Sequence, residues 1–473
     1  RRVRWVSLEA GAMGEPVVLT FLGGAETVTG SKLLLDGPGG RLLVDCGLYQ
    51  GEREWRRRNW EPFAVEPASV DDVVLTHCHL DHSGYLPVLV REGFAGPVWM
   101  TEGTAALTAI VLRDSAHLNE REAEYAAKGG WSRHDPPLPL YTTADAERAI
   151  AQFRVVPFDR LVRVGADGRT AVRLGRAGHV LGSATVHVRT GSADVLFSGD
   201  LGRRTHPVLH PRADPPAART VVVESTYGDR QHPRPSGRPH AELAAAVRRT
   251  VERGGSVLVP AFAVDRTELV LAALSDLVRQ GEIPAVPVFV DSPMALAALE
   301  AYHLAGARGE LKEDLEALID LPQLRAAHTV EESMALNHPR VPSIIVSSSG
   351  MATGGRVVHH LRHLLPDRRN TVVLTGYQAP GTRGRALLDG AAQLKMFGRY
   401  VPVRAEVVVD EEFSVHADAE ELLDWLRAMP QTPETVYVVH GERTASQAFA
   451  DRVRAELGCV VVVPRVGERV RVD

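Results

Sequence analysis

The chain has 473 residues, a net charge of −5 and 24% charged residues. This length is too great for one typical hydrophobic core and predicts two to four domains. The negative net charge excludes a protein that attracts nucleic acid through a globally basic surface, so any such contact must come from a local site. No run approaches the ~18 consecutive apolar residues of a membrane span, and residues 1–15 lack the apolar core of a secretory signal.

The chain contains three cysteines, Cys46, Cys78 and Cys459. They cannot form a disulfide framework, and their odd number fits a reducing cytoplasm, which is the location we expect. Cys78 lies between two histidines, but adjacent side chains of an extended segment point in opposite directions. This favours a packed thiol over a metal ligand at Cys78.

Strands and helices alternate over the first half of the chain, and turns follow several strands directly. The apolar runs predict strands over residues 17–22, 32–35, 42–44, 73–75, 98–100, 172–174, 185–189, 195–198 and 221–223. Helical patterns cover residues 82–92, 104–127 and 143–152. This order predicts a layered α/β architecture.

A segment rich in Pro, Arg, His and Gly, from Asp229 to Arg238, predicts a linker. After it, segments 241–253, 256–260, 267–279, 286–290, 343–347 and 371–374 alternate between helix and strand, as in a parallel-sheet domain. From about Phe397 the first pattern returns, with strands over 403–409, 435–439 and 460–463 and helices over 419–427 and 444–457. We therefore expect an inserted domain over residues 229–396 between two parts of one domain, 1–228 and 397–473.

Four potential metal ligands follow the apolar run Val73–Leu75 within six residues: His77, His79, Asp81 and His82. Histidine and aspartate are poor residues for the core of a strand, so packing does not explain this cluster. Imidazole and carboxylate together suit zinc and similar cations. The segment therefore predicts a metal site with hydrolytic chemistry, in preference to a solvated polar turn.

Two further candidates, His179 and Asp200, follow later apolar strands. A carboxylate such as Asp200 can bridge two zinc ions. Asp45, at the end of the strand over 42–44, fits better as a hydrogen-bond partner that orients a ligand histidine.

The order of these residues resembles the first four motifs of the metallo-β-lactamase superfamily: Asp45, then His77-X-His79-X-Asp81-His82, then His179, then Asp200. Glu224, His416 and His440 match the three further motifs of its β-CASP subfamily of nucleases. The resemblance implies an αββα metallo-β-lactamase sandwich with an inserted parallel-sheet α/β β-CASP domain. Val415 departs from the subfamily pattern, in which many relatives carry Gly or Ala before the motif histidine.

The resemblance also implies the roles of these residues. It implies one Zn²⁺ held by His77, His79, His179 and Asp200, and a second held by Asp81, His82, Asp200 and His440. A hydroxide activated by the two metals would then hydrolyse phosphodiester bonds of single-stranded RNA, endonucleolytically, from the 5′ end, or both. His416 would be a general acid or phosphate contact with Glu224 as its partner, and Asp81 and Asp45 are counted with them as catalytic. In the subfamily, histidine at the position of His440 accompanies RNA-processing enzymes.

Substrate contacts are expected in turns that follow strands of the inserted domain. The small residues after the strand over 343–347 let backbone N–H groups approach an anion, with Arg356 as a charged partner. A purely structural turn is the alternative. The segment is not a Walker A motif, so hydrolysis of nucleoside triphosphates is not expected. The predicted substrate-binding residues are Ser348, Ser349, Gly350, Met351, Arg356 and Ser414; segments 260–266, 291–294 and 375–378 are further candidates for lining the RNA site.

Other features of the sequence receive less specific interpretations. His359, His360 and His363 are expected to face the surface or the substrate site and not to bind metal. Residues 114–140 are a candidate lid. A DNA or small-molecule hydrolase on the same metal core and a non-enzymatic RNA-processing scaffold are the alternative functions, and a homodimer is left open.

Overall fold

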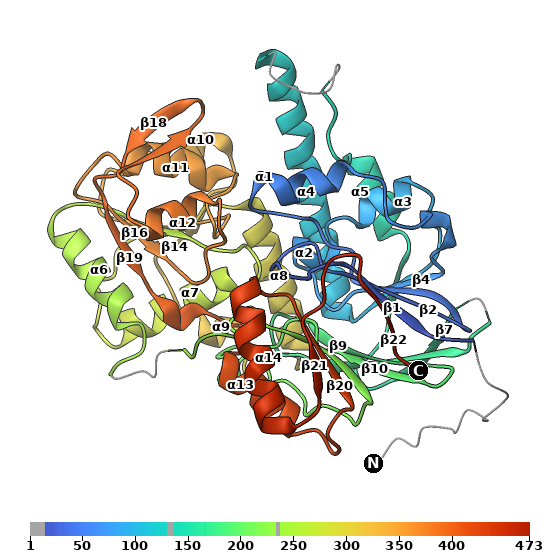
Figure 1. Cartoon of the computed structure of the whole chain (residues 1–473). Coiled ribbons are helices and arrows are strands. Elements are labelled where there is room, and N and C mark those ends of the chain that lie inside the picture. Colours follow the sequence, from blue (N-terminus) through green and yellow to red (C-terminus); the bar gives the residue numbers. More distant parts are fainter. Residues whose placement is uncertain (1–14, 130–136, 166, 233–236) are drawn as a thin grey trace.

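The computed structural model describes residues 15–129, 137–165, 167–232 and 237–473. Most of the N-terminal segment examined for a signal, residues 130–136 of the candidate lid, and residues 233–236 of the expected linker lie outside the described residues. Two seven-stranded sheets form one lobe, and a six-stranded sheet forms a second lobe beside it (Figure 1). No helix in the described part of the chain combines the length and apolar character needed to cross a bilayer.

The first sheet has the strand order β22-β1-β2-β3-β4-β5-β6. The segment from β1 to β3 is an antiparallel meander, whereas β4, β5 and β6 run parallel to β3. Parallel strands bury both faces and need helical crossovers, which α3, α4 and α5 provide. The bounds are β1 Val18–Gly23, β2 Lys32–Gly37, β3 Gly40–Val44, β4 Asp72–Val74, β5 Val98–Met100, β6 Phe153–Val155, β22 Arg469–Arg471, α3 Leu86–Arg91, α4 Glu102–Gly129 and α5 Thr143–Ile150.

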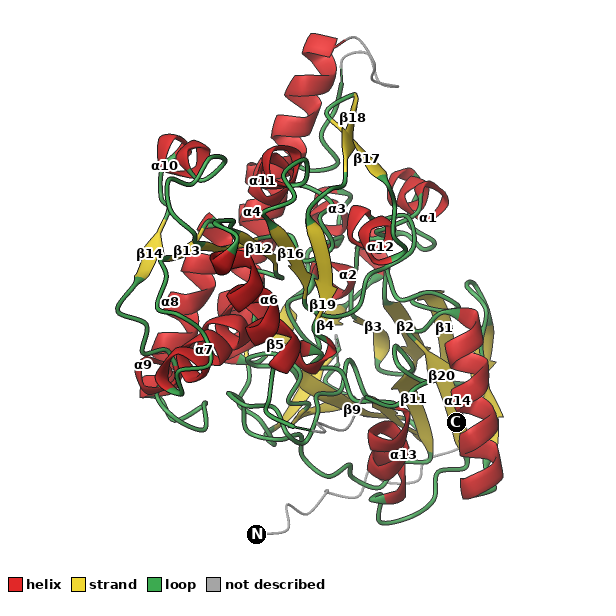
Figure 2. Ribbon diagram, turned by 90° about the vertical axis from the view of Figure 1, so that its left-hand side faces the viewer, coloured by secondary structure: helices red, strands yellow, loops and turns green. Residues whose placement is uncertain are grey.

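The second sheet has the order β21-β20-β11-β10-β9-β8-β7. Its strands β20 and β21 come from the C-terminal part of the chain, which returns to the first lobe (Figure 2). In the same part of the chain, α13 precedes β20, and α14 connects β20 to β21. The bounds are β7 Leu161–Val164, β8 Thr170–Arg176, β9 Ala184–Thr190, β10 Ala193–Phe197, β11 Thr220–Glu224, β20 Thr435–Val439, β21 Val460–Val462, α13 Ala419–Arg427 and α14 Arg443–Leu457.

Apolar layers hold these elements together. Phe21 and Val44 of the first sheet pack with Val186 and Phe197 of the second in the core between the sheets. A separate core lies outside the first sheet among α3, α4 and α5. Another lies outside the second sheet, where buried residues of α13 and α14, Trp425 among them, pack on the strands. The expected αββα sandwich is therefore confirmed.

The second lobe contains an all-parallel sheet of order β14-β13-β15-β12-β16-β19. Alternate residues of β12 face opposite sides, so that Val257 and Val259 pack with α6, α7 and α8 while Leu258 packs with α11 and α12. The bounds are β12 Val257–Pro260, β13 Val288–Val290, β14 Leu324–Ala326, β15 Ile344–Ser347, β16 Thr371–Leu374, β19 Glu406–Val409, α6 Ala241–Glu252, α7 Arg266–Arg279, α8 Pro293–Ala307, α11 Arg356–Leu364 and α12 Arg383–Leu388.

The strand expected over 403–409 belongs to this second lobe and not to the sandwich. In the structure β19 pairs with β16 in parallel register from Thr371 opposite Glu406 to Leu374 opposite Val409. A hairpin of β17 (Gln393–Met396) and β18 (Arg399–Pro402) precedes it. We therefore propose that the inserted domain ends near residue 409 and not at 396.

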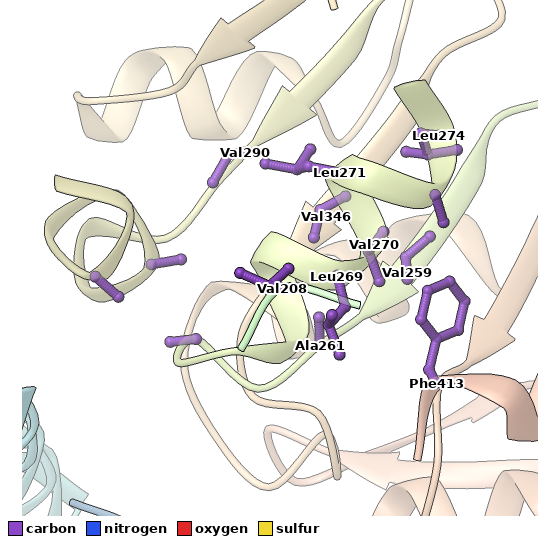
Figure 3. Packing of buried hydrophobic residues seen from close by; sticks show 14 of the residues in the cluster. Val208, Val259, Ala261, Leu269, Val270, Leu271, Leu274, Val290, Val346 and Phe413 are labelled. Carbon is purple, nitrogen blue, oxygen red and sulfur yellow. The ribbon is translucent and has the colours of Figure 1, made fainter. Parts of the chain in front are cut away.

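The two lobes share an apolar core. Val208, which follows β10, and Phe413, which precedes α13, belong to the same buried cluster as Ala261 and Leu269 of the inserted domain (Figure 3). Cys78 is fully buried in this cluster too, which confirms the prediction of a packed thiol. A shared core of this kind holds the loops of the second lobe at a fixed position over the strand ends of the first.

The helix expected over 82–92 is divided in two. The structure has α2 at Leu80–Ser83 and α3 at Leu86–Arg91. Pro87 stands in the first turn of α3, where its missing N–H costs nothing, but a continuous helix would place the ring against the preceding turn. The break places Asp81 and His82 on a single short turn of their own.

Candidate metal centre

The seven predicted metal ligands lie together, at the edge where strands of both sheets of the sandwich end. The loop after β4 carries His77 and His79, and α2 carries the next two ligands. His179 lies between β8 and β9, Asp200 follows β10, and His440 follows β20. The parallel strands β10, β11 and β20 end at one edge of the second sheet, which brings together Asp200 and His440. The stacking of the two sheets adds the loop after β4, so that ligands 363 residues apart in sequence, from 77 to 440, lie together.

Close backbone approach is needed for this convergence. A Cβ atom on Gly202 would lie 1.7 Å from the carbonyl oxygen of Gly178, so the loops that carry Asp200 and His179 touch through glycine backbone. His440 itself has a φ of 48°, an uncommon conformation for a residue with a side chain. Its backbone N–H donates to the carbonyl of Gly24 at 2.6 Å, which helps to hold this conformation.

A first group of ligand atoms comprises His77, His79, His179 and Asp200, with one donor atom from each within 4.8 Å of the others. His77 Nε2 lies 3.1 Å from His79 Nδ1, and His179 Nε2 lies 3.4 Å from the same atom. Asp200 Oδ2 is 3.6 Å from His77 Nε2 and 3.7 Å from His179 Nε2. Four such atoms this close together could serve as the ligands of one tetrahedral metal ion.

A second group comprises Asp81, His82 and His440. His82 Nε2 lies 3.1 Å from His440 Nε2, which in turn is 3.4 Å from Asp81 Oδ2. Asp200 reaches this group with its other oxygen, because Oδ1 lies 3.3 Å from His82 Nε2. Asp200 therefore stands between the two groups and turns one carboxylate oxygen to each.

Asp45 lies behind the second group. Its Oδ2 is 2.7 Å from His82 Nδ1, and its two oxygens accept from the backbone N–H and the hydroxyl of Thr76 at 2.8 and 2.9 Å. A carboxylate at Nδ1 fixes the tautomer in which Nε2 is free to bind a cation. The contact between Asp45 Oδ2 and His82 Nδ1 is the one that the predicted orienting role of Asp45 requires.

The chemistry of the donor set fits a metal. Asp200 Oδ1 is buried and has no hydrogen-bond partner among the described residues, an arrangement that is unfavourable unless a cation completes it. Burial is the largest influence on His77 and His179, and it holds the pKa of each well below the ordinary histidine value. Burial opposes ionisation of Asp200, but the surrounding imidazoles hold the pKa of this carboxyl well below its usual range. Burial lowers the pKa of His82, but Asp200 and Asp45 raise it well above the ordinary value. A cation binds the ionised carboxylate and the neutral imidazole, so binding at His82 would displace a proton.

His416 and Glu224 lie beside the first group. His416 Nδ1 is 3.5 Å from Glu224 Oε1 and 3.9 Å from Asp200 Oδ2. Glu224 is buried and accepts from the backbone N–H of Leu201 at 2.7 Å and of Thr226 at 3.3 Å. Burial alone would lower the pKa of His416, but the Glu224 carboxylate and then Asp200 raise it above the ordinary value. The side chains of His416 and Asp81 are 18% and 20% exposed, so this side of the centre is open to solvent.

Comparison with known proteins agrees with this geometry. Residues 29–261 match the model of the metallo-beta-lactamase superfamily, residues 267–387 the Beta-Casp domain, and residues 400–464 the Zn-dependent metallo-hydrolase RNA specificity domain. The chain is 37% identical over 456 residues to Ribonuclease TTHA0252 of Thermus thermophilus, an alignment that covers 95% of this chain and 99% of that protein. The chain belongs to the β-CASP family of the metallo-β-lactamase superfamily.

This β-CASP protein is a hydrolase of that superfamily. It is also 32% identical over 473 residues to Transcription termination factor FttA of Methanocaldococcus jannaschii, covering 96% of this chain and 71% of that protein. A crystal structure of a protein of unknown function from Enterococcus faecalis V583 has the same fold, with a TM-score of 0.52 at 14% identity; the match covers 96% of this chain and 100% of that one.

The predicted substrate-binding residues of the β-CASP protein occupy different surroundings. Gly350 packs closely on Phe262, whose ring centroid lies 6.3 Å from that of His79, so the turn after β15 stands near the metal ligands. Ser348 and Ser349 bond to other hydroxyls of the same lobe, Ser292 and Thr353 respectively. Met351 is half-buried in this turn, and Ser414 is buried two residues before His416.

Arg356 is already engaged within the protein. Its Nη1 donates to Asp291 Oδ1 at 2.6 Å and to the carbonyl of Ala327 at 3.0 Å. The same Asp291 lies 2.5 Å from Nε2 of His360, which is fully buried. The expectation that His360 faces the surface or the substrate site is therefore wrong, because its imidazole pairs with a buried carboxylate inside the lobe. The role of Arg356 in binding substrate stays a prediction, and these contacts give it a structural role as well.

Three further residues near the metal ligands, Thr76, Tyr227 and Tyr377, were not predicted as functional from the sequence. Thr76 bonds to Asp45 and its hydroxyl lies 3.0 Å from His77 Nδ1. Tyr227 has its ring 6.0 Å from that of His416 and 6.1 Å from that of Tyr377. Thr76 directly precedes the motif residue His77, and Tyr227 lies three residues after Glu224; this closeness in sequence is the signal that could have identified them. Tyr377 lies in a segment named only as a candidate.

Proposed function

We propose that this β-CASP protein is a zinc-dependent ribonuclease that hydrolyses phosphodiester bonds of single-stranded RNA. The proposal is carried by the orientation of the Asp200 carboxylate, which turns one oxygen towards His77 and His179 and the other towards His82. A shared carboxylate of this kind suits two metal ions, which is the usual arrangement for hydrolysis of phosphate esters. The similarity to a ribonuclease and to the Zn-dependent metallo-hydrolase RNA specificity domain favours RNA as the substrate.

The proposed ligands divide between two Zn²⁺ ions. His77, His79, His179 and Asp200 would hold one, and Asp81, His82, Asp200 and His440 the other. Imidazole and carboxylate form a set of borderline softness, which zinc accepts readily and magnesium does not. When bound, such ions activate water as the nucleophile and offset the charge that develops on the phosphate.

The chain's own residues orient the reaction. Glu224 is fixed by two backbone N–H groups and in turn faces His416 Nδ1. With Nδ1 on that side of the ring, Nε2 is the nitrogen of His416 that can face a substrate. We assign His416 Nε2 as the donor of a proton to the leaving oxygen, and Glu224 as the carboxylate that positions the imidazole and stabilises its protonated form. The turn Ser348–Met351 and Ser414 are proposed as contacts to the RNA.

Removal of metal is expected to abolish cleavage. Dialysis against a chelator followed by assay on a single-stranded RNA, end-labelled, should give no products, and added Zn²⁺ should restore them. The comparison substrates are single-stranded DNA and duplex RNA of matched sequence. We expect the cleavage rate of the single-stranded RNA to exceed the rates of both by at least about tenfold, because a few contacts to the substrate give selectivity of this size. Cleavage that survives the chelator, or equal rates on RNA and DNA, would contradict the proposal.

Replacement of Asp45 by asparagine is expected to weaken zinc binding at the second site. The variant keeps the volume but loses the carboxylate charge at His82 Nδ1, and loss of such a partner typically lowers metal affinity by about 10- to 100-fold. Competition with a zinc-binding dye measures the change. Asp36→Asn, at the end of β2 and paired on the surface with Arg41, is the matched control and should bind zinc as the wild type does.

A further inference from the structure

Arg266 stands at the end of segment 260–266, which was expected only as a whole to line the RNA site, and no individual role was assigned to its side chain. It is the first residue of α7, and only 6% of it is exposed. Its guanidinium packs on a neighbouring loop at Gly376, where a Cβ atom would lie 2.4 Å from Arg266 Nη1. The side chain is therefore held by two loops of the inserted domain, the one before α7 and the one after β16.

Among the described residues, no side chain forms a hydrogen bond or ion pair with the guanidinium of Arg266. Its Nε and Nη1 are buried and make no hydrogen bond to any described residue. A buried cation normally has an anion that bonds to it, and a buried donor without an acceptor is unfavourable. A buried N–H donor without an acceptor in a folded protein requires an explanation. A bound ligand that accepts the hydrogen bond is one such explanation.

The nearby carboxylates are already occupied. Asp265 bonds to His206 Nε2 at 3.1 Å and accepts from the hydroxyl of Tyr302 at 2.7 Å. Asp410 lies 3.2 Å from His240 Nδ1 and accepts from the backbone N–H of Glu412 at 3.0 Å. Each carboxylate therefore has partners of its own, and neither forms an ion pair with the guanidinium.

Glu268 does not complete the pair either. It lies two residues after Arg266 on α7, a spacing at which side chains do not face each other. Both of its oxygens are buried without hydrogen-bond partners among the described residues. Burial, and then the charge of Asp265, hold the pKa of Glu268 well above its usual range, so the charged form of this carboxyl is disfavoured.

Arg266 lies close to the reacting centre. The loop that leads to it, 261–265, includes Phe262, whose ring is near His79. Gly376, on which the guanidinium packs, directly precedes Tyr377. The ring of Tyr377 lies 6.1 Å from that of Tyr227, which in turn lies 6.0 Å from the ring of His416.

We propose that Arg266 binds a phosphate of the RNA backbone next to the metal centre. The inference rests on the proposed function and adds the group that holds the substrate from the side of the inserted domain. A guanidinium offers a planar fork of N–H donors that matches two oxygens of a phosphate. The phosphate would give Nε and Nη1 the acceptors that the protein itself does not provide.

The test measures kcat/KM for single-stranded RNA against salt concentration in the wild type, Arg266→Met and Arg266→Lys. The methionine variant should lose about 10- to 100-fold in kcat/KM. In a plot of log kcat/KM against the logarithm of salt concentration, its slope should be shallower than that of the wild type by about 0.7, which is the contribution of one phosphate contact on a single strand. The lysine variant keeps the charge but not the fork, so it should keep the slope and lose about tenfold. Zinc content and melting temperature are recorded for each.

Arg279→Met is the matched control, since Arg279 ends the same helix on the surface in a pair with Asp276; its rates and slope should equal those of the wild type. Wild-type kcat/KM and slope in Arg266→Met would overturn the inference, as would a loss of rate with an unchanged slope. If the methionine variant fails to fold, the lysine variant decides, and wild-type kcat/KM there would overturn it. A wild-type protein without activity on RNA would instead refute the proposed function.

Discussion

Replacement of Asp200 by asparagine is expected to lower RNA cleavage by at least about 10⁴-fold. The variant keeps the shape of the side chain but removes the charge that both ligand groups share. Two metal ions contribute several kcal/mol to stabilisation of the charged transition state, and a loss of about 6 kcal/mol corresponds to roughly 10⁴ in rate. Assays of kcat/KM on single-stranded RNA, together with metal analysis of the purified variant, measure both effects.

The metal content should fall together with the rate, because one carboxylate oxygen of Asp200 faces each group. Asp194→Asn is the matched control: Asp194 lies on β10, the strand that leads to Asp200, and also pairs with a histidine, His187, at 2.6 Å. That variant should keep its metal and its activity even if its melting temperature falls. An Asp200→Asn protein that retains both ions and cleaves RNA at the wild-type rate would show that Asp200 is not the shared ligand.

Replacement of His416 by alanine is expected to lower kcat on RNA by about 10²- to 10⁴-fold, the usual contribution of a general acid. Metal content should not change, since His416 belongs to neither ligand group. His303→Ala, with a side chain that is 47% exposed on α8, is the control and should have no effect on the rate.

A substrate with a better leaving group separates proton donation from other roles of His416. In bis(4-nitrophenyl) phosphate the leaving group departs as a stable anion and needs no proton, so His416→Ala should lose much less activity on this ester than on RNA. An equal loss on both substrates would assign His416 to binding or to structure. Undiminished cleavage of RNA would remove it from the reaction altogether.

The metal ligands could be predicted from the sequence because each follows a short, strongly apolar strand and is itself a poor core residue. His77, His79, Asp81 and His82 also lie within six residues, so their proximity does not depend on the tertiary fold. Their meeting with His440 does depend on it. That contact requires β20 to pair with β11 after a separate lobe has intervened, and only the resemblance to the β-CASP family predicted it.

Features that depend on pairing between distant strands were not predictable. An apolar run over 403–409 fits either lobe equally well, and only its partner β16 assigns it to the second. The same holds for His360, which was expected at the surface or the substrate site but whose imidazole pairs with Asp291, the residue after β13. Arg266 carries no motif of its own, and its lack of a partner is visible only once the neighbouring carboxylates have theirs.

The most direct test of the two-metal centre is a crystal structure of the zinc-loaded protein with diffraction data on both sides of the zinc absorption edge. We expect two anomalous peaks, one beside Asp200 Oδ2 among His77, His79 and His179, and one beside Oδ1 with His440 among its neighbours. A single peak, or peaks that neither oxygen of Asp200 contacts, would contradict the assignment.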